Sequence, residues 1–167
     1  LDLSVAEVAS LSAVVCGWLV QLKYSPEVAV LAALVVATLF GAANGFGVTR
    51  LRIPSLIMTL GTAAIAKGCA FMITQGVAFV GRWPQGFTGL ARGTTAGIPN
   101  LVLWMGGATL FAYVLVNWTR TGANMVATGE ADEAARLSGI ATGRMKRIGL
   151  LLAGTFAGIM AVLLAAN

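Results

Sequence analysis

The stretch IGLLLAGTFAGIMAVLLAA (residues 148–166) contains no charged side chain and only one hydroxyl, that of Thr155. A helix of about 20 residues is about 30 Å long, which matches the hydrocarbon core of a bilayer. Four further apolar stretches of similar length precede it, at residues 3–22, 28–48, 53–74 and 98–118. In lipid each backbone polar group needs an internal partner, so these stretches should be helices rather than open strands. The sequence predicts an all-α, polytopic membrane protein with about five transmembrane helices.

The composition supports the same class. Hydrophobic residues make up 58% of the chain and charged residues 10%, whereas an average soluble domain has about 25% charged residues. The formal net charge of +5 could indicate a nucleic-acid partner. However, the basic residues form no patch interleaved with aromatics on a polar surface. We therefore expect no nucleic-acid binding and assign the excess of basic residues to cytoplasmic loops.

The distribution of basic residues between loops predicts the orientation. If the charged stretch at residues 129–147 is cytoplasmic, the turn at residues 49–52 lies on the same side. That side then carries seven basic residues and the opposite side three, with Lys67 inside a span, as the positive-inside rule requires. The seven are Arg50, Arg52, Arg120, Arg136, Arg144, Lys146 and Arg147, and the three are Lys23, Arg82 and Arg92. Residues 75–97 then form a periplasmic loop, whose Gly and Thr content predicts irregular surface structure.

The sequence also predicts where several helices begin. Ser4 followed by Glu7 has the spacing of a capping box, in which each side chain bonds the other's backbone N–H. Pro54 and Pro99 are expected in the first turn of the third and fourth spans, where a missing N–H costs nothing.

Among the polar side chains inside predicted spans are Asn44, Thr59 and Thr62. A polar group in lipid is costly unless it is paired, so these residues should face the protein interior or a wet cavity. Two interpretations remain open. The side chains either form hydrogen bonds between helices or line a hydrophilic translocation path.

The residues needed for most catalytic chemistry are missing. The chain has no histidine, which removes the commonest general base and the commonest metal ligand. It has no Gly-rich loop ending in Gly-Lys-Ser/Thr, and the acidic residues Asp2, Glu7 and Glu27 lie at or near span ends rather than in pairs within a span. We expect no enzyme activity, no metal site and no cofactor in this chain.

The charged stretch GEADEAARLSGIATGRMKR (residues 129–147) stands between two apolar spans. Glu130, Asp132 and Glu133 should occupy the first turn of a short helix, where they complement its dipole. Gly139 should end that helix in a left-handed conformation, with Ile140 returning to Ala135 as in a Schellman motif. Such a short helix needs a partner to pack on, which favours a docking site for a cytoplasmic protein. The alternative is a solvated loop with one helical turn.

The sequence resembles the permease subunits of bacterial ABC importers for monosaccharides of the ribose, xylose and galactose type. Three stretches carry the resemblance, in the order found in the family. They are LDLSVAEVASLSAVV, GAANGFGVTRLRIPSLIMTLGTAAIAKG and ATGEADEAARLSGIATGRMKRIGLLLAGTFAGIMAVLLAA. The combination of IPSLIMTLGT with EAARLSGI is the specific part.

The resemblance implies a transmembrane permease domain over residues 1–167, in the bacterial inner membrane, with residues 119–147 as a cytoplasmic coupling loop. The short helix would be a coupling helix that sits in a cleft of a separate ATP-binding subunit, through Glu133, Ala134, Ala135, Arg136, Leu137 and Gly139. A second permease subunit, identical or homologous, would pair around the path. A periplasmic sugar-binding protein would deliver the substrate, and Arg82 and Arg92 are candidates to dock it. The chain would be about half of a typical member.

The resemblance implies import of a monosaccharide without naming which one. Nucleosides or branched-chain amino acids, carried by permeases of the same superfamily, are the alternative substrates. A self-sufficient channel or an intramembrane enzyme is a further alternative, against which the missing histidine, the missing paired carboxylates and the docking helix all count.

Overall fold

The structure is a computed structural model that describes residues 1–77, 83 and 85–166. Four helices are long and apolar enough to cross a membrane. These are α2 (Pro26–Thr49), α3 (Ser55–Thr74), α5 (Asn100–Trp118) and α8 (Thr142–Ala166). A shorter apolar helix, α1 (Val5–Gln21), precedes them. The all-α polytopic fold predicted from the sequence is therefore confirmed.

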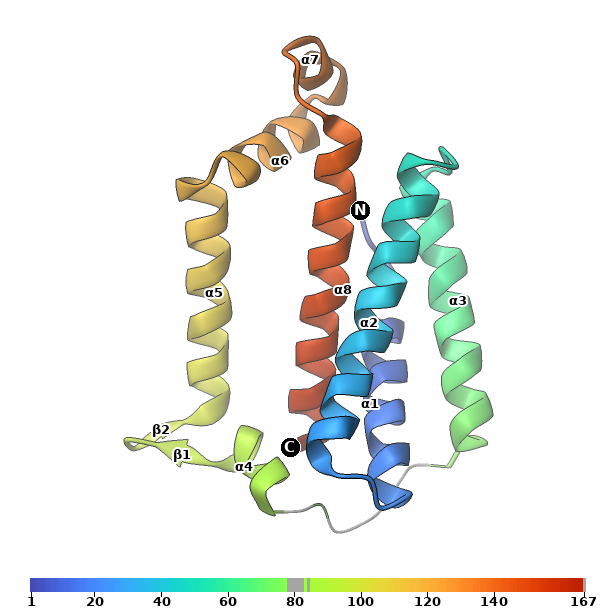
Figure 1. The fold of residues 1–167 in the computed structure, drawn as a ribbon, viewed down its shortest axis with the longest axis vertical. Coiled ribbons are helices and arrows are strands. Elements are labelled where there is room, and N and C mark those ends of the chain that lie inside the picture. Colours follow the sequence, from blue (N-terminus) through green and yellow to red (C-terminus); the bar gives the residue numbers. More distant parts are fainter. Residues whose placement is uncertain (78–82, 84, 167) are drawn as a thin grey trace.

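The core of the bundle is built from α1, α2, α3 and α8 (Figure 1). α2 and α8 approach so closely that Gly41 and Gly154 cannot carry a side chain. A Cβ atom on Gly41 would lie 2.6 Å from the carbonyl oxygen of Leu150, and one on Gly154 would lie 2.6 Å from that of Ala37. Glycines at such crossings let membrane helices pack backbone to backbone. The remaining core is made mostly of alanine, with Val8 and Leu11 of α1.

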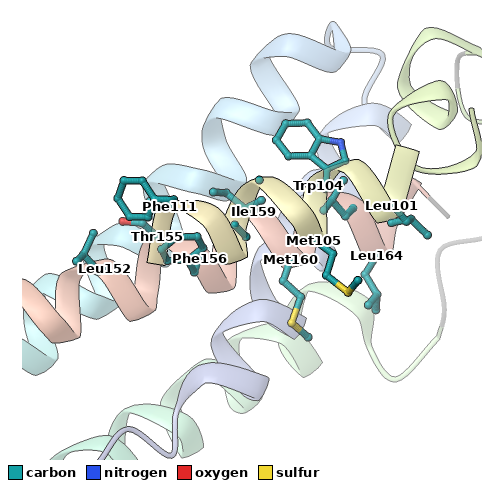
Figure 2. Close-up of a pocket in the computed structure, with 13 residues that line it drawn as sticks. Leu101, Trp104, Met105, Phe111, Leu152, Thr155, Phe156, Ile159, Met160 and Leu164 are labelled. Atoms are coloured by element: carbon teal, nitrogen blue, oxygen red, sulfur yellow. The ribbon is translucent and has the colours of Figure 1, made fainter. Parts of the chain in front are cut away.

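α5 stands apart from this bundle (Figure 1). None of its residues is buried. An apolar cavity of about 640 Å³ lies between α5 and α8, and the rings of Phe111 and Phe156 meet across it with centroids 5.7 Å apart (Figure 2). The exposed apolar side chains of α5 are the surface expected of a helix that faces lipid or further helices.

The two ends of the molecule carry different short elements (Figure 1). At one end the α2–α3 turn lies with α6 (Arg120–Glu130) and α7 (Asp132–Leu137). At the other end lie α4 (Gln85–Arg92) and a hairpin of β1 (Thr94–Thr95) and β2 (Ile98–Pro99), which pair antiparallel. The predicted grouping of residues 49–52 with 129–147, opposite the loop at residues 75–97, agrees with this arrangement for the part of the loop that the structure describes. The side that faces the cytoplasm stays a prediction.

The prediction that residues 75–97 are irregular is wrong for most of the described part of this loop. Residues 85–92 form α4, and the hairpin follows. Phe87 and Ala91 are buried in one cluster with Cys16 of α1, Ala29 of α2 and Val162 of α8, and α4 packs mainly on α8. Phe87, Leu90 and Ala91 have the i, i+3, i+4 spacing of an amphipathic helix, a signal that the Gly and Thr content obscured.

The capping box predicted at Ser4 does not form, because the Ser4 side chain bonds no N–H of α1. Its hydroxyl instead donates to Asp2 Oδ1 (2.6 Å) and accepts a hydrogen bond from Asn44 of α2. Glu7, the other half of the predicted box, lies 3.8 Å from Lys67 Nζ of α3. Pro54 and Pro99 come one residue earlier than predicted, directly before α3 and α5.

Candidate functional site

The short helix predicted in the charged stretch is present as α7, the six residues Asp132–Leu137. Asp132 and Glu133 lie in its first turn, as predicted. Glu130 does not, because it ends α6 instead. The break between the two helices falls at Ala131, whose φ of −150° and ψ of 87° are not helical. The chain therefore turns sharply at Ala131, and α7 follows α6 directly instead of standing as an isolated helix.

The C-terminal end of α7 has the Schellman geometry. The Ile140 N–H donates to the Ala135 carbonyl (3.0 Å), and the Gly139 N–H donates to that of Arg136 (3.0 Å). Gly139 has a φ of +83°, a left-handed value that glycine adopts without strain. This end reverses the chain so that residue 142 can begin α8.

The predicted coupling residues differ in exposure. Ala135 is 5% exposed and packs within this chain. Leu137 is 80% exposed, the highest value among the large apolar residues that the structure describes. Glu133, Ala134 and Arg136 are also exposed, and Glu133 and Arg136 form a weak surface pair at 3.4 Å. The surface that α7 offers to another protein is thus centred on Leu137, with Glu133 and Ala134 one turn earlier.

An ion pair attaches α7 to the first turns of α8. Lys146 Nζ donates to Asp132 Oδ2 at 2.7 Å. This hydrogen bond is the main cause that lowers the pKa of the Asp132 carboxyl below its ordinary value. A displacement of α7 would therefore be transmitted directly to the transmembrane helix α8. The pairing of Lys146 could not be predicted from the sequence, because Asp132 lies fourteen residues away across the corner.

α6 was missed as a helix in the predicted coupling loop. Thr119 starts it by accepting a hydrogen bond from the Gly122 N–H (3.0 Å). A Cβ atom on Gly122 would overlap the Leu115 carbonyl oxygen, so only glycine allows this tight corner with α5. A threonine followed three residues later by glycine was the available signal. The coupling loop is thus mostly helical and bridges α5 to α8 (Figure 1).

The structure brings two of the three predicted path residues together. Asn44 of α2 is 1% exposed and donates to the Ser4 hydroxyl (2.9 Å), while its carbonyl accepts from Thr62 of α3 (2.8 Å). The Thr59 hydroxyl is also buried and bonds the carbonyl of Ser55 in its own helix (2.8 Å). All three side chains are thus engaged within the bundle. Their part in a translocation path stays a prediction.

Of the two arginines proposed to dock a binding protein, the structure describes one. Arg92 is exposed at the C-terminal end of α4. Arg82 lies outside the described residues. In the part of the chain that the structure describes, no three metal-ligating side chains gather.

Comparison with known proteins gives consistent results. A protein-family model described as the branched-chain amino acid transport system / permease component matches residues 1–167. The L-arabinose transport system permease protein AraH of Escherichia coli (strain K12) is 36% identical over 167 residues, which cover 99% of this chain and 50% of AraH. The autoinducer 2 import system permease protein LsrC of Enterobacter sp. (strain 638) is 31% identical over 171 residues, covering 100% of this chain and 48% of LsrC.

The chain thus spans about half the length of the curated relatives that it matches. No solved structure matches it significantly.

Proposed function

The chain belongs to the permease family of the branched-chain amino acid transport system type, and from this premise we propose that it forms the transmembrane permease part of an ABC importer for a monosaccharide. It is a multi-pass protein of the bacterial inner membrane. The observation that carries the proposal is the match over the whole chain, together with relatives named for L-arabinose and autoinducer 2 import. The exposed helix α7 at one end of the bundle supports it independently.

The energy source in this proposal is a separate ATP-binding subunit on the cytoplasmic side. Its cleft receives α7, and the exposed Leu137 supplies the apolar contact that a short surface helix needs for affinity. Glu133 and Arg136 lie beside this contact and can be matched by charges on the partner. Rim charges of this kind act mainly on association rate and specificity.

The path of the coupling follows the contacts within the chain. Closure of the ATP-binding subunits moves α7, and the Asp132–Lys146 pair passes the displacement to α8. α8 is in backbone contact with α2 at Gly41 and Gly154, so the two helices move as one unit. Asn44 then links α2 to α1 and α3. Displacement at one end of the molecule can thereby change the arrangement of the spans.

Two further partners complete the proposed assembly. A second permease subunit pairs with this one to enclose the path. A periplasmic binding protein delivers the sugar at the end that carries α4 and the hairpin, where Arg92 is exposed. Since the binding protein selects the sugar before transport, the spans need only small and weakly polar path residues.

The test is uptake of labelled substrates by cells that lack their own sugar and amino-acid importers. The cells express the full-length permease with its proposed ATP-binding and periplasmic binding proteins. We expect uptake of one monosaccharide and none of leucine, and loss of uptake when the ATP-binding subunit is omitted. Leucine uptake would shift the substrate class to branched-chain amino acids, which the family description names, and nucleoside uptake would shift it to nucleosides. Uptake that persists without the ATP-binding subunit would contradict the proposal.

A further inference from the structure

A groove between α2 and α8 combines apolar and basic side chains. It has a volume of about 570 Å³ and runs between α2 and α8 near the end that carries α7. Its walls are apolar and its mouth is basic. The residues that line it are Ala42, Phe46, Arg144, Arg147, Ile148 and Leu151.

The spacing of these residues aligns the groove with the helices. Ala42 and Phe46 are four residues apart on α2, and Ile148 and Leu151 are three apart on α8, so each pair lies along one face. The part of α8 that lines the groove, residues 144–151, extends about 10 Å along the helix axis. Phe46 and Leu151 are exposed. The groove is therefore a strip of apolar surface parallel to the spans.

The basic mouth has no partner of opposite charge in the described part of the chain. Arg144 and Arg147 are both exposed and lie on one face of α8. Neither forms an ion pair with a described carboxylate, and Arg147 makes only a long contact of 3.4 Å to the Gly143 carbonyl. Two exposed guanidinium groups without a carboxylate partner, next to an apolar strip at the end of the spans, favour an anion that is held at the membrane interface.

We infer that this groove binds an anionic phospholipid, with the headgroup phosphate on Arg144 and Arg147 and part of an acyl chain along Phe46 and Leu151. Guanidinium groups match phosphate oxygens in geometry as well as in charge. Basic pockets between spans on the cytoplasmic side suit such headgroups, because their negative charge is attracted to Lys and Arg side chains at the membrane surface. The inference does not depend on the substrate that the protein transports.

The charge pattern favours a lipid over a protein occupant. A covering helix would have to place two acidic residues at the interface opposite the arginines and apolar residues below them. A phospholipid carries both parts in one molecule. Protein coverage of the groove is the competing outcome of the test.

The experiment is native mass spectrometry of the full-length permease in detergent, titrated with phosphatidylglycerol or with phosphatidylcholine of the same acyl chains. We expect tighter binding of phosphatidylglycerol to the wild type. The double variant Arg144→Gln/Arg147→Gln should lose about tenfold in phosphatidylglycerol affinity. The matched control Arg52→Gln/Arg120→Gln removes the same charge at the same end, outside the groove, and should bind as the wild type does.

A second variant tests the groove itself. Ala42→Trp keeps both arginines and fills the space between the helices, so it should also weaken phosphatidylglycerol binding. Equal binding of the two lipids by the wild type would overturn the inference and indicate that protein covers the groove. An equal loss in the control double variant, or unchanged binding by Ala42→Trp, would overturn it as well, because diffuse charge would then explain the preference.

Discussion

At the scale of single residues, Asn44 connects three helices. Its amide is fully buried, donates to Ser4 of α1 and accepts from Thr62 of α3. Asp2 extends the chain of bonds beyond Ser4. Loss of the amide would leave the Ser4 and Thr62 hydroxyls without this partner in a nonpolar interior, where an unpaired polar group is costly.

Replacement of Asn44 by alanine should lower the stability of the full-length protein by about 1 kcal/mol, the range measured for hydrogen bonds between membrane helices. Thermal unfolding in detergent would show it as a lower midpoint. The control Val35→Ala trims an exposed side chain on the same helix and should have little effect. An Asn44→Ala protein with normal stability but altered uptake would mean that Asn44 acts on the substrate and not on packing.

The sequence predicted that Asn44 would face the protein interior or a wet cavity, but not which residues it would bond. An amide within an apolar helix must avoid lipid, and this holds in any arrangement of spans. The partner depends on which helices meet at that depth, which local patterns do not encode. For the same reason the sequence assigned Ser4 to a cap, the usual role of serine at a helix start, and missed its bond to Asn44 forty positions away.

At the scale of elements, α7 is the feature on which the proposed coupling depends. It has only six residues and is too short to be stable alone. Three features hold it in place: the buried Ala135, the left-handed Gly139 and the ion pair with α8. Its exposed residues are therefore presented from a fixed position.

The left-handed conformation of Gly139 gives a direct test of this corner. Gly139→Val should cost about 1–2 kcal/mol, because a Cβ atom crowds the following carbonyl. Gly139→Asn should cost less, since asparagine tolerates this conformation. In the full-length permease the valine variant should insert normally yet retain less ATP-binding subunit in a pull-down, and the asparagine variant should lie between it and the wild type. Equal retention by all three proteins would show that the geometry of this corner is not needed for docking.

The Asp132–Lys146 pair should control how firmly α7 is held. Asp132→Asn and Lys146→Gln should each increase amide hydrogen exchange over residues 132–137, and the double variant should add little, because both changes remove one interaction. In the wild type the pKa of Asp132 is lowered from 3.8 in the folded state. Its contribution is therefore present above pH 3.8 and is lost as the pH falls through the lower, folded value.

Exchange over residues 132–137 should accordingly show no added loss of protection between pH 5 and 8, once the intrinsic rates are corrected. The pair is exposed to solvent, so added salt should weaken it. Protection that is unaffected by either substitution would mean that packing of Ala135 alone holds the helix.

The long helices were predicted from the sequence, whereas most of the short ones were not. The long spans were predictable, because some twenty apolar residues leave a membrane helix as the only low-energy structure. α4 and α6 were not predicted, since each is short and rich in glycine or threonine, and tertiary contacts stabilise it. Phe87 of α4 is buried among residues of α1, α2 and α8, and Gly122 of α6 packs against the backbone of Leu115. The Schellman end of α7 was predictable because it is a local pattern around a single glycine.

At the scale of the whole molecule, charge and structure agree on two distinct ends. The end with α6 and α7 carries most of the basic residues, and the opposite end carries α4 and the hairpin. Apolar side chains cover the space between them. This arrangement is expected for a protein oriented by the positive-inside rule.

The orientation can be measured with a thiol reagent that does not cross membranes. In a full-length background without native cysteines, Thr94→Cys in the hairpin should be labelled from the periplasm. Ser138→Cys after α7 should be labelled only after the membrane is opened. Both positions are exposed, so access to the thiol reports the side. Labelling of Ser138→Cys in intact cells would reverse the orientation and remove α7 from the reach of a cytoplasmic partner.

The most direct test of the central claim is whether α7 touches the ATP-binding subunit. A photoreactive group is attached to Leu137→Cys in the full-length permease, and the complex with its ATP-binding subunit is irradiated in membranes. Thr94→Cys at the opposite end is the control. The account predicts a cross-linked product of permease and ATP-binding subunit from Leu137→Cys, with a yield that changes when ATP is added, and none from Thr94→Cys. Co-purification of an intact complex without any cross-link from Leu137→Cys would contradict it.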